Sequence, residues 1–144
     1  MIITRATVQD IKQAATLFDS YRQFYKQAPD LDGAETYITD RLQKGDSAIF
    51  LAKAENEYVG FMQLYPTFSS ISMKHAWILN DLYVSESARQ QGVGEALLEM
   101  AETFARESGA CSIALSVQHQ TITKHSVCTN EKGMSGISSF IIMS

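Results

Sequence analysis

The sequence has little of several features that characterise specialised classes of protein. Only two cysteines, Cys111 and Cys128, occur in 144 residues. They are too few for a disulfide framework, so we expect reduced thiols. No apolar run approaches the roughly 20 residues that span a bilayer, so no membrane partner is expected. The segment from Met1 to Arg5 lacks the apolar core of a signal peptide, which predicts a cytoplasmic protein.

An excess of basic residues is also missing. The chain has 12 Lys and Arg against 16 Asp and Glu, which gives a net charge of −4. Nucleic-acid-binding domains usually present a basic face, so no nucleic-acid partner is expected. The histidines and cysteines show no metal-ligand spacing, and no metal is expected. A content of 45% apolar residues in a chain of this length is typical of one globular domain.

Hydrophobic periodicity predicts an α/β fold. Thr7 and Asp10 have the spacing of a capping box, and residues 11–25 then follow helical spacing. Gly45 and Gly109 follow two further helical segments, as glycine does at helix ends. The expected strands are Ile2–Arg5, 47–53, 58–65, 76–84 and 112–117, the further helices are 34–44 and 92–108, and a Ser-rich loop covers 66–73.

The pattern changes from Thr121 onward. This segment has no clean period of either kind, and it includes Gly133 and Gly136. One terminal strand, at 139–143, is the only element expected there. We therefore predict a core at residues 1–120 and an atypical tail at residues 121–144, both within one domain.

One glycine-containing turn carries the chemical signal. The strand ending at Val84 is followed by Gly92 and Gly94, which open a helix. The first N–H groups of a helix have no intrahelical partner, and glycine lets an anion approach the backbone closely. A dinucleotide fingerprint would need a third glycine where Leu97 stands, and a phosphate loop would need Gly-Lys-Ser/Thr. A turn with two glycines and no ligand is the remaining alternative.

The residues around these glycines favour a ligand. The stretch Arg89-Gln90-Gln91-Gly92-Val93-Gly94 resembles the Arg/Gln-x-x-Gly-x-Gly/Ala signature of the GNAT N-acetyltransferase superfamily. It follows the strand Asn80-Asp81-Leu82-Tyr83-Val84, as in that family. The resemblance covers about residues 1–120 and is nearest to the polyamine and small-amine branch. It implies a mixed, mostly antiparallel sheet flanked by helices, with the C-terminal helix and strands altered or incomplete.

The resemblance also implies acetyl transfer from acetyl-CoA to a primary amine, which attacks the thioester directly. The acceptor would be a small-molecule or peptide amine. Backbone groups of the signature would hold the CoA pyrophosphate, and the end of the strand would pair with the pantetheine arm. The implied cofactor-binding residues are Leu82, Tyr83, Val84, Arg89, Gln90, Gln91, Gly92, Val93, Gly94 and Glu95.

The implied catalytic residues are Asp81 and Leu82. An N–H near Leu82 would stabilise the developing oxyanion. Asp81 would accept the proton of the amine, directly or through water; the alternative is a carboxylate that caps a strand end. Asn80 stands where the branch often has an acid, and it is placed with Tyr21 and Tyr25 in the acceptor site. Phe24 could line this site with the two tyrosines, but all three are more often core residues of a first helix.

The C-terminal end departs from the family. The resembling enzymes continue with a Leu-Tyr pair, a Gly-Phe or Gly-Tyr and an aromatic-rich strand, and that first tyrosine commonly protonates the departing thiolate. This chain has no tyrosine after Tyr83. The loss predicts weak turnover, an open sheet edge and a homodimer that shields it. Alternatives are a CoA-binding but catalytically impaired remnant and a non-enzymatic interaction module.

The genetic code offers a reason for the departure. If the codons of residues 121–144 are read one base earlier, two bases of each new codon are fixed and only the first is free. The stretches that start at Val127, Lys132 and Ser139 then permit Leu-Tyr, Gly-Tyr and Phe-Tyr-His. These words stand in the family order and spacing. We therefore hypothesise a frameshift near residues 118–120.

Overall fold

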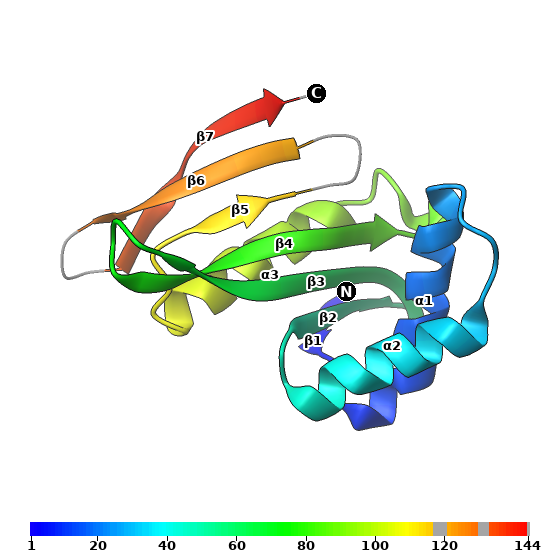
Figure 1. Ribbon diagram of the computed structural model, residues 1–144. Coiled ribbons are helices and arrows are strands. Elements are labelled where there is room, and N and C mark those ends of the chain that lie inside the picture. Colours follow the sequence, from blue (N-terminus) through cyan, green and yellow to red (C-terminus); the bar gives the residue numbers. More distant parts are fainter. Residues whose placement is uncertain (117–120, 130–132, 144) are drawn as a thin grey trace. The chain divides into compact units, whose positions relative to one another are not determined.

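The computed structural model describes residues 1–116, 121–129 and 133–143. Along the described chain, a strand is followed by two α-helices, three strands, a third α-helix and three more strands (Figure 1). The helices are α1 (Ile11–Phe24), α2 (Leu31–Lys44) and α3 (Val93–Glu107). The strands are β1 (Ile2–Arg5), β2 (Ala48–Ala54), β3 (Glu57–Ser69), β4 (Lys74–Val84), β5 (Ile113–Leu115), β6 (Thr121–Thr129) and β7 (Gly133–Met143).

Five strands form one sheet in the order β1-β2-β3-β4-β5. β1 pairs antiparallel with β2, with Ile2 opposite Lys53. β5 pairs parallel with β4, with Trp77 opposite Ile113. A parallel pair needs a long crossover connection, and α3 lies in that connection. The sheet is therefore mixed and mostly antiparallel, and the α/β prediction is confirmed.

The chain divides into two compact units that share β3, β4 and α3. The first unit contains Met1–Gln63 and Leu82–Leu97, and the second contains Leu64–Asp81 and Leu98–Ser144. In the first unit, α1 and α2 contact each other. Apolar side chains of both helices, of β2 and β3 and of the residue after β1 form its core: Ala6, Ala14, Ala15, Leu17, Ala34, Ile38, Ile49, Leu51 and Phe61.

Local sequence signals start and stop the helices of the first unit. The Thr7 side chain accepts the Gln9 N–H at 3.3 Å, and the Asp10 carboxylate accepts the Thr7 N–H at 2.8 Å. These bonds make the expected capping box, which here precedes a 3₁₀ turn that leads into α1. Gly45 ends α2 with a φ of +63°, the left-handed conformation that glycine adopts without strain.

The connection between α1 and α2 is held by a buried carboxylate. Asp19 accepts hydrogen bonds from Arg22 at 2.9 Å, from Gln23 at 3.0 Å and from the backbone N–H of Asp30 at 3.0 Å. Such a carboxylate is stabilised because its partners replace the water that burial removes. Asp30 in turn caps α2 by accepting the Gly33 N–H. This cap starts α2 at Leu31, three residues before the expected start at residue 34.

In the second unit, Trp77 of β4 packs against α3. Its ring centroid lies 4.9 Å from that of Phe104, and its Nε1–H donates to Ser108 Oγ at 2.9 Å. The Cys111 N–H donates to the His75 carbonyl at 3.0 Å as the chain enters β5. These contacts join the end of α3 to the first half of β4. Cys111 is buried and forms no disulfide within the described residues; Cys128 lies where no side chain is described.

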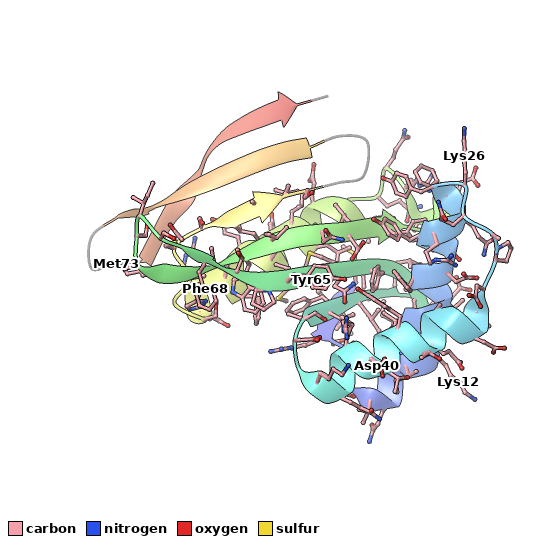
Figure 2. All side chains as sticks on the ribbon, viewed as in Figure 1. Lys12, Lys26, Asp40, Tyr65, Phe68 and Met73 are labelled. Atoms are coloured by element: carbon pink, nitrogen blue, oxygen red, sulfur yellow. The ribbon has the colours of Figure 1, made fainter. Side chains whose placement is uncertain are left out.

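The hairpin of β3 and β4 is longer than the sequence indicated. β3 continues through Pro66 to Ser69, so the loop expected at 66–73 is wrong for its first half. β2 has 7 residues and β3 has 13, so the distal part of β3 extends past β2. A proline is tolerated where a strand lacks a partner for its missing N–H. The hairpin carries three highly exposed apolar side chains near its turn (Figure 2): Phe68, Ile71 and Met73.

The tail prediction is wrong in its secondary structure. β6 and β7 form an antiparallel two-stranded sheet, with Thr121 opposite Met143 and a register irregularity between His125 and Val127. The expected strand at 139–143 lies within β7. Strands can pair through backbone hydrogen bonds even where apolar and polar residues do not alternate along the sequence. β5 ends the hydrogen-bonded order of the larger sheet. Val117, expected at the end of β5, lies outside the described residues.

Gly60 lets α3 approach β3 closely. A Cβ at this position would lie 2.9 Å from Val93 Cγ1, 3.0 Å from Ala52 Cβ and 3.1 Å from Leu97 Cδ1. We expect Gly60→Ala to destabilise the fold by about 1–3 kcal/mol, because overpacking forces neighbours off their rotamers. Urea unfolding followed by circular dichroism measures the loss. Gly60→Ala with Val93→Ala should recover part of the stability, and an unaltered midpoint in the single variant would contradict the packing.

Within the described part of the chain, no helix combines the length and apolar character that crossing a bilayer requires.

Candidate active site

The turn before α3 contains two left-handed residues. Gln90 has a φ of +64° and Gly92 a φ of +81°. Glycine adopts this conformation freely, whereas a residue with a Cβ pays about 1–2 kcal/mol. The side chain of the neighbouring Gln91 donates to the Ser87 carbonyl at 3.2 Å, which helps to hold the turn. The strained turn places the backbone of Gly92 directly before the first residue of α3.

Arg89 ties this turn back to β4. Its Nε–H donates to the Val84 carbonyl at 3.0 Å. The guanidinium carbon lies 4.9 Å from the ring centroid of Phe24 and 5.9 Å from that of Tyr83. Each such cation–π contact contributes about 0.5–1 kcal/mol at an exposed site. The turn is therefore anchored to β4 and to the end of α1 before any ligand binds.

An open cavity lies at the N-terminus of α3. Its volume is about 470 Å³. Space for a ligand exists beside both glycines: a Cβ at Gly92 would have no atom within 4 Å, and one at Gly94 would meet only Val84 Cγ2 at 3.9 Å. The first N–H groups of α3 point along the helix axis without an intrahelical acceptor, which favours an anion. The cavity is lined by Val84, Ala88, Arg89, Gln90, Gly92, Val93, Gly94 and Glu95.

This lining includes most of the residues expected to hold the cofactor. Leu82, Tyr83 and Gln91 are the expected residues that it omits. Val93 lines the cavity although its side chain is buried against Gly60. The Glu95 side chain is exposed and adds a negative charge in the first turn of α3, so its backbone rather than its carboxylate suits an anion.

β4 changes the side to which it directs its backbone groups. The Leu79 carbonyl accepts the Ser116 N–H at 2.9 Å on the β5 side, whereas the Ser85 N–H donates to the Val59 carbonyl of β3 at 2.8 Å. In a regular strand, residues two apart face the same neighbour, and 79 and 85 differ by an even number. One irregular residue must therefore lie between them, in the segment that contains Leu82. Bulges of this kind re-aim backbone groups.

Asp81 lies in that segment and is 4% exposed. Its Oδ1 accepts the side-chain amide N–H of Asn80 at 3.2 Å. Asn80 is half-buried. The two neighbours thus form a polar pair next to the irregular part of β4. A buried carboxylate that keeps hydrogen-bond partners can serve either as a base or as a fixed structural group.

The two tyrosines of α1 differ in exposure. Tyr21 is 5% exposed and packs against Phe61 and Tyr83, with ring centroids 6.4 Å away in both cases. Tyr25 is half-buried and lies edge-on to Tyr21 at 5.2 Å. The Tyr21 ring is therefore part of the core, which was the alternative to a place in the acceptor site. Tyr25 keeps surface that faces solvent.

Sequence reasoning missed Ala88, which lines the cavity and is buried in the 3₁₀ turn Glu86–Ala88. It considered Phe24 for the acceptor site but did not predict its contact: Phe24, which is 56% exposed, stacks under the Arg89 guanidinium. The stack joins residues 65 positions apart, so no local pattern indicates it. Among the described residues, no group of three or more His, Cys, Asp or Glu is placed to hold a metal ion.

Comparisons with known proteins agree with this geometry. The family model described as "Acetyltransferase (GNAT) family" matches residues 14–126. The uncharacterized N-acetyltransferase YhfO of Bacillus subtilis is 46% identical over 119 residues, which are 83% of this chain and 80% of YhfO. A probable acetyltransferase of Haemophilus influenzae is 34% identical over 105 residues, 72% of each chain.

Solved structures include a similar fold. The crystal structure of a probable acetyltransferase superposes with a TM-score of 0.77 and 42% identity, covering 81% of this chain and 78% of that one. The family match spans the β4 strand, the Arg89–Gly94 turn and α3. Together with the anion-binding geometry of that turn, these similarities show that the chain belongs to the GNAT acetyltransferase family, whose activity is acetyl transfer.

Proposed function

We propose that this protein transfers the acetyl group of acetyl-CoA to a primary amine. The observation that supports this most is the cavity at the N-terminus of α3, which two glycines leave open to the backbone. In this proposal the N–H groups from Arg89 to Gly94 hold the CoA pyrophosphate. The α3 dipole adds positive potential at the same place.

The pantetheine arm is assigned to the last residues of β4. Peptide-like chains add to a strand edge through backbone hydrogen bonds. The Ser85 N–H points to β3, and across a trans peptide the preceding Val84 carbonyl must point the other way. The irregular residue near Leu82 is of the kind that turns one N–H out of the ladder, as an oxyanion donor requires.

The amine attacks the thioester carbon, the C–S bond breaks, and the amine proton must be removed. We assign the base to Asp81, acting directly or through water. Asn80 and Tyr25 are proposed to contact the acceptor, while Tyr21 supports Tyr25 from the core. The acceptor is a small-molecule or peptide amine, for which the polyamine branch is the proposed class. The net charge of −4 favours a cationic substrate.

We expect Asp81→Asn to lower kcat by about 10²-fold, because general-base catalysis typically contributes 10²–10⁴-fold. Affinity for CoA should stay within about twofold, since Asp81 does not line the α3 cavity. Steady-state rates and calorimetry measure the two quantities. Thermal unfolding serves as the control, because a capping role for the buried carboxylate would lower stability without a specific loss of kcat.

The simplest test of the function is a pair of measurements on the intact chain. Calorimetry with acetyl-CoA separates an interaction module, which would not bind, from a CoA-binding protein. Turnover with a panel of polyamines, small amines and peptide amines then separates an active enzyme from a remnant. Binding without turnover on every amine would support the remnant and contradict the catalytic assignment.

The frameshift near residues 118–120 is likewise a proposal. Its support lies in the sequence: the displaced reading permits the Leu-Tyr and Gly-Tyr of the family ending within residues 127–134. Sequencing the coding DNA is decisive: codons of residues 127–134 that forbid Leu-Tyr or Gly-Tyr in the displaced frame would end the idea.

We also propose that the chain forms a homodimer. The β3–β4 hairpin exposes Phe68, Ile71 and Met73. Exposed apolar patches favour pairing with another chain. β6 contacts β5, so the proposal rests on the hairpin and not on an open edge at β5.

A further inference from the structure

Arg89 is an exposed residue whose guanidinium is nevertheless held at several points. Its Nε–H donates a hydrogen bond to the Val84 carbonyl, and one face of the guanidinium lies over the Phe24 ring. Phe24 also contacts Tyr83, with ring centroids 6.5 Å apart at 61°. It also lies edge-on to Tyr25, with ring centroids 5.2 Å apart. The exposed Phe24 ring is thus held between two aromatic rings and the cation above it.

The geometry distinguishes two functions for Arg89. If Arg89 bound a phosphate directly, it would act mainly as a positive charge, which lysine also supplies. If Arg89 instead holds the turn in place, the planar guanidinium is needed, because its face stacks on a ring while its Nε–H donates a hydrogen bond at the edge. Lysine has neither the plane nor an Nε–H near the backbone. The bond to Val84 and the stack on Phe24 together match the second description.

We propose that Phe24 is a positioning residue for the cofactor turn. It holds the Arg89 guanidinium flat, so that Nε fixes the Val84 carbonyl and the turn before α3 keeps its anion-binding shape. The stack also joins that turn to the last residue of α1. This inference rests on the proposed function, because the anion is taken to be the pyrophosphate of CoA.

Calorimetric titration of CoA into the full chain tests the proposal with four variants. We expect Phe24→Leu to weaken binding about 3- to 5-fold, since one stacking contact is lost, and Phe24→Trp to restore it. Arg89→Lys and Arg89→Gln should weaken binding equally, by about 10-fold. Phe68→Leu is the matched control: it makes the same change at an 84% exposed ring (Figure 2) and should leave the affinity unchanged.

A second ligand and a stability measurement separate positioning from general damage. The 3′-phospho-ADP half of CoA contains the pyrophosphate without the pantetheine arm, so Phe24→Leu should weaken its binding by the same factor as that of CoA, while thermal unfolding stays like that of the Phe68→Leu control. If Arg89→Lys binds CoA like the parent, or Phe24→Leu binds CoA or 3′-phospho-ADP unchanged, the proposal is overturned. If Phe24→Leu lowers the unfolding temperature in step with its affinity, the residue is merely structural and the proposal is likewise overturned. Absence of CoA binding in the parent chain would overturn the proposed function itself.

Discussion

Gly94→Val is expected to weaken CoA binding by about 100-fold, which corresponds to about 2.7 kcal/mol. Gly94 lines the cavity at the start of α3, and the ligand approaches its bare backbone. A valine side chain would occupy that space and block the N–H groups. Calorimetry with CoA measures the effect.

The same substitution should leave the fold intact. A Cβ at Gly94 meets only Val84 Cγ2, at an ordinary contact distance of 3.9 Å. Valine also has a higher helix propensity than glycine. Gly94→Ala should give an intermediate loss of affinity. Gly92 is unsuitable for this test because its φ of +81° would strain any side chain. Ala96→Val, in the same helix but outside the cavity lining, is the control; equal affinity in all three variants would remove the cofactor assignment.

Replacing residues 121–144 by the displaced reading is expected to raise kcat on an amine substrate by about 10²-fold. The displaced reading contains Leu-Tyr, and a positioned acid for the leaving thiolate contributes about 10²–10⁴-fold. The chain as it stands has no tyrosine after Tyr83 to supply that proton. Steady-state kinetics with acetyl-CoA and the best amine of the panel measures the gain.

The matched control is the restored chain in which the tyrosine of Leu-Tyr is changed to phenylalanine. It should keep the restored fold and lose most of the gain in kcat. Limited proteolysis should show a more resistant C-terminal segment in both restored chains. Sedimentation should show self-association of the present chain through the apolar tip of its β3–β4 hairpin. A present chain that is monomeric and already as active as the restored one would contradict the frameshift, the role of the tyrosine and the dimer.

Patterns of short range in the sequence predicted the fold well. The capping box at Thr7 and Asp10 and the glycine at position 45 act within one helical turn, so nearby residues suffice to show them. The strand–turn–helix unit around Gly92 was also visible, because glycine at a left-handed φ has a local cause. Most of the residues expected to hold the cofactor line one cavity for the same reason: they follow one another in the chain.

Contacts between distant segments decided the rest. Pro66 reads as a loop residue, yet it lies inside β3 because β2 is too short to pair with that part of the strand. The Phe24 and Arg89 stack and the side switch of β4 depend on neighbours that only folding supplies. The sequence by itself determined the family signature and the helix ends. The tertiary structure decided which backbone groups are free and which rings hold the turn, because hydrogen-bond pairing and stacking depend on spatial rather than sequential proximity.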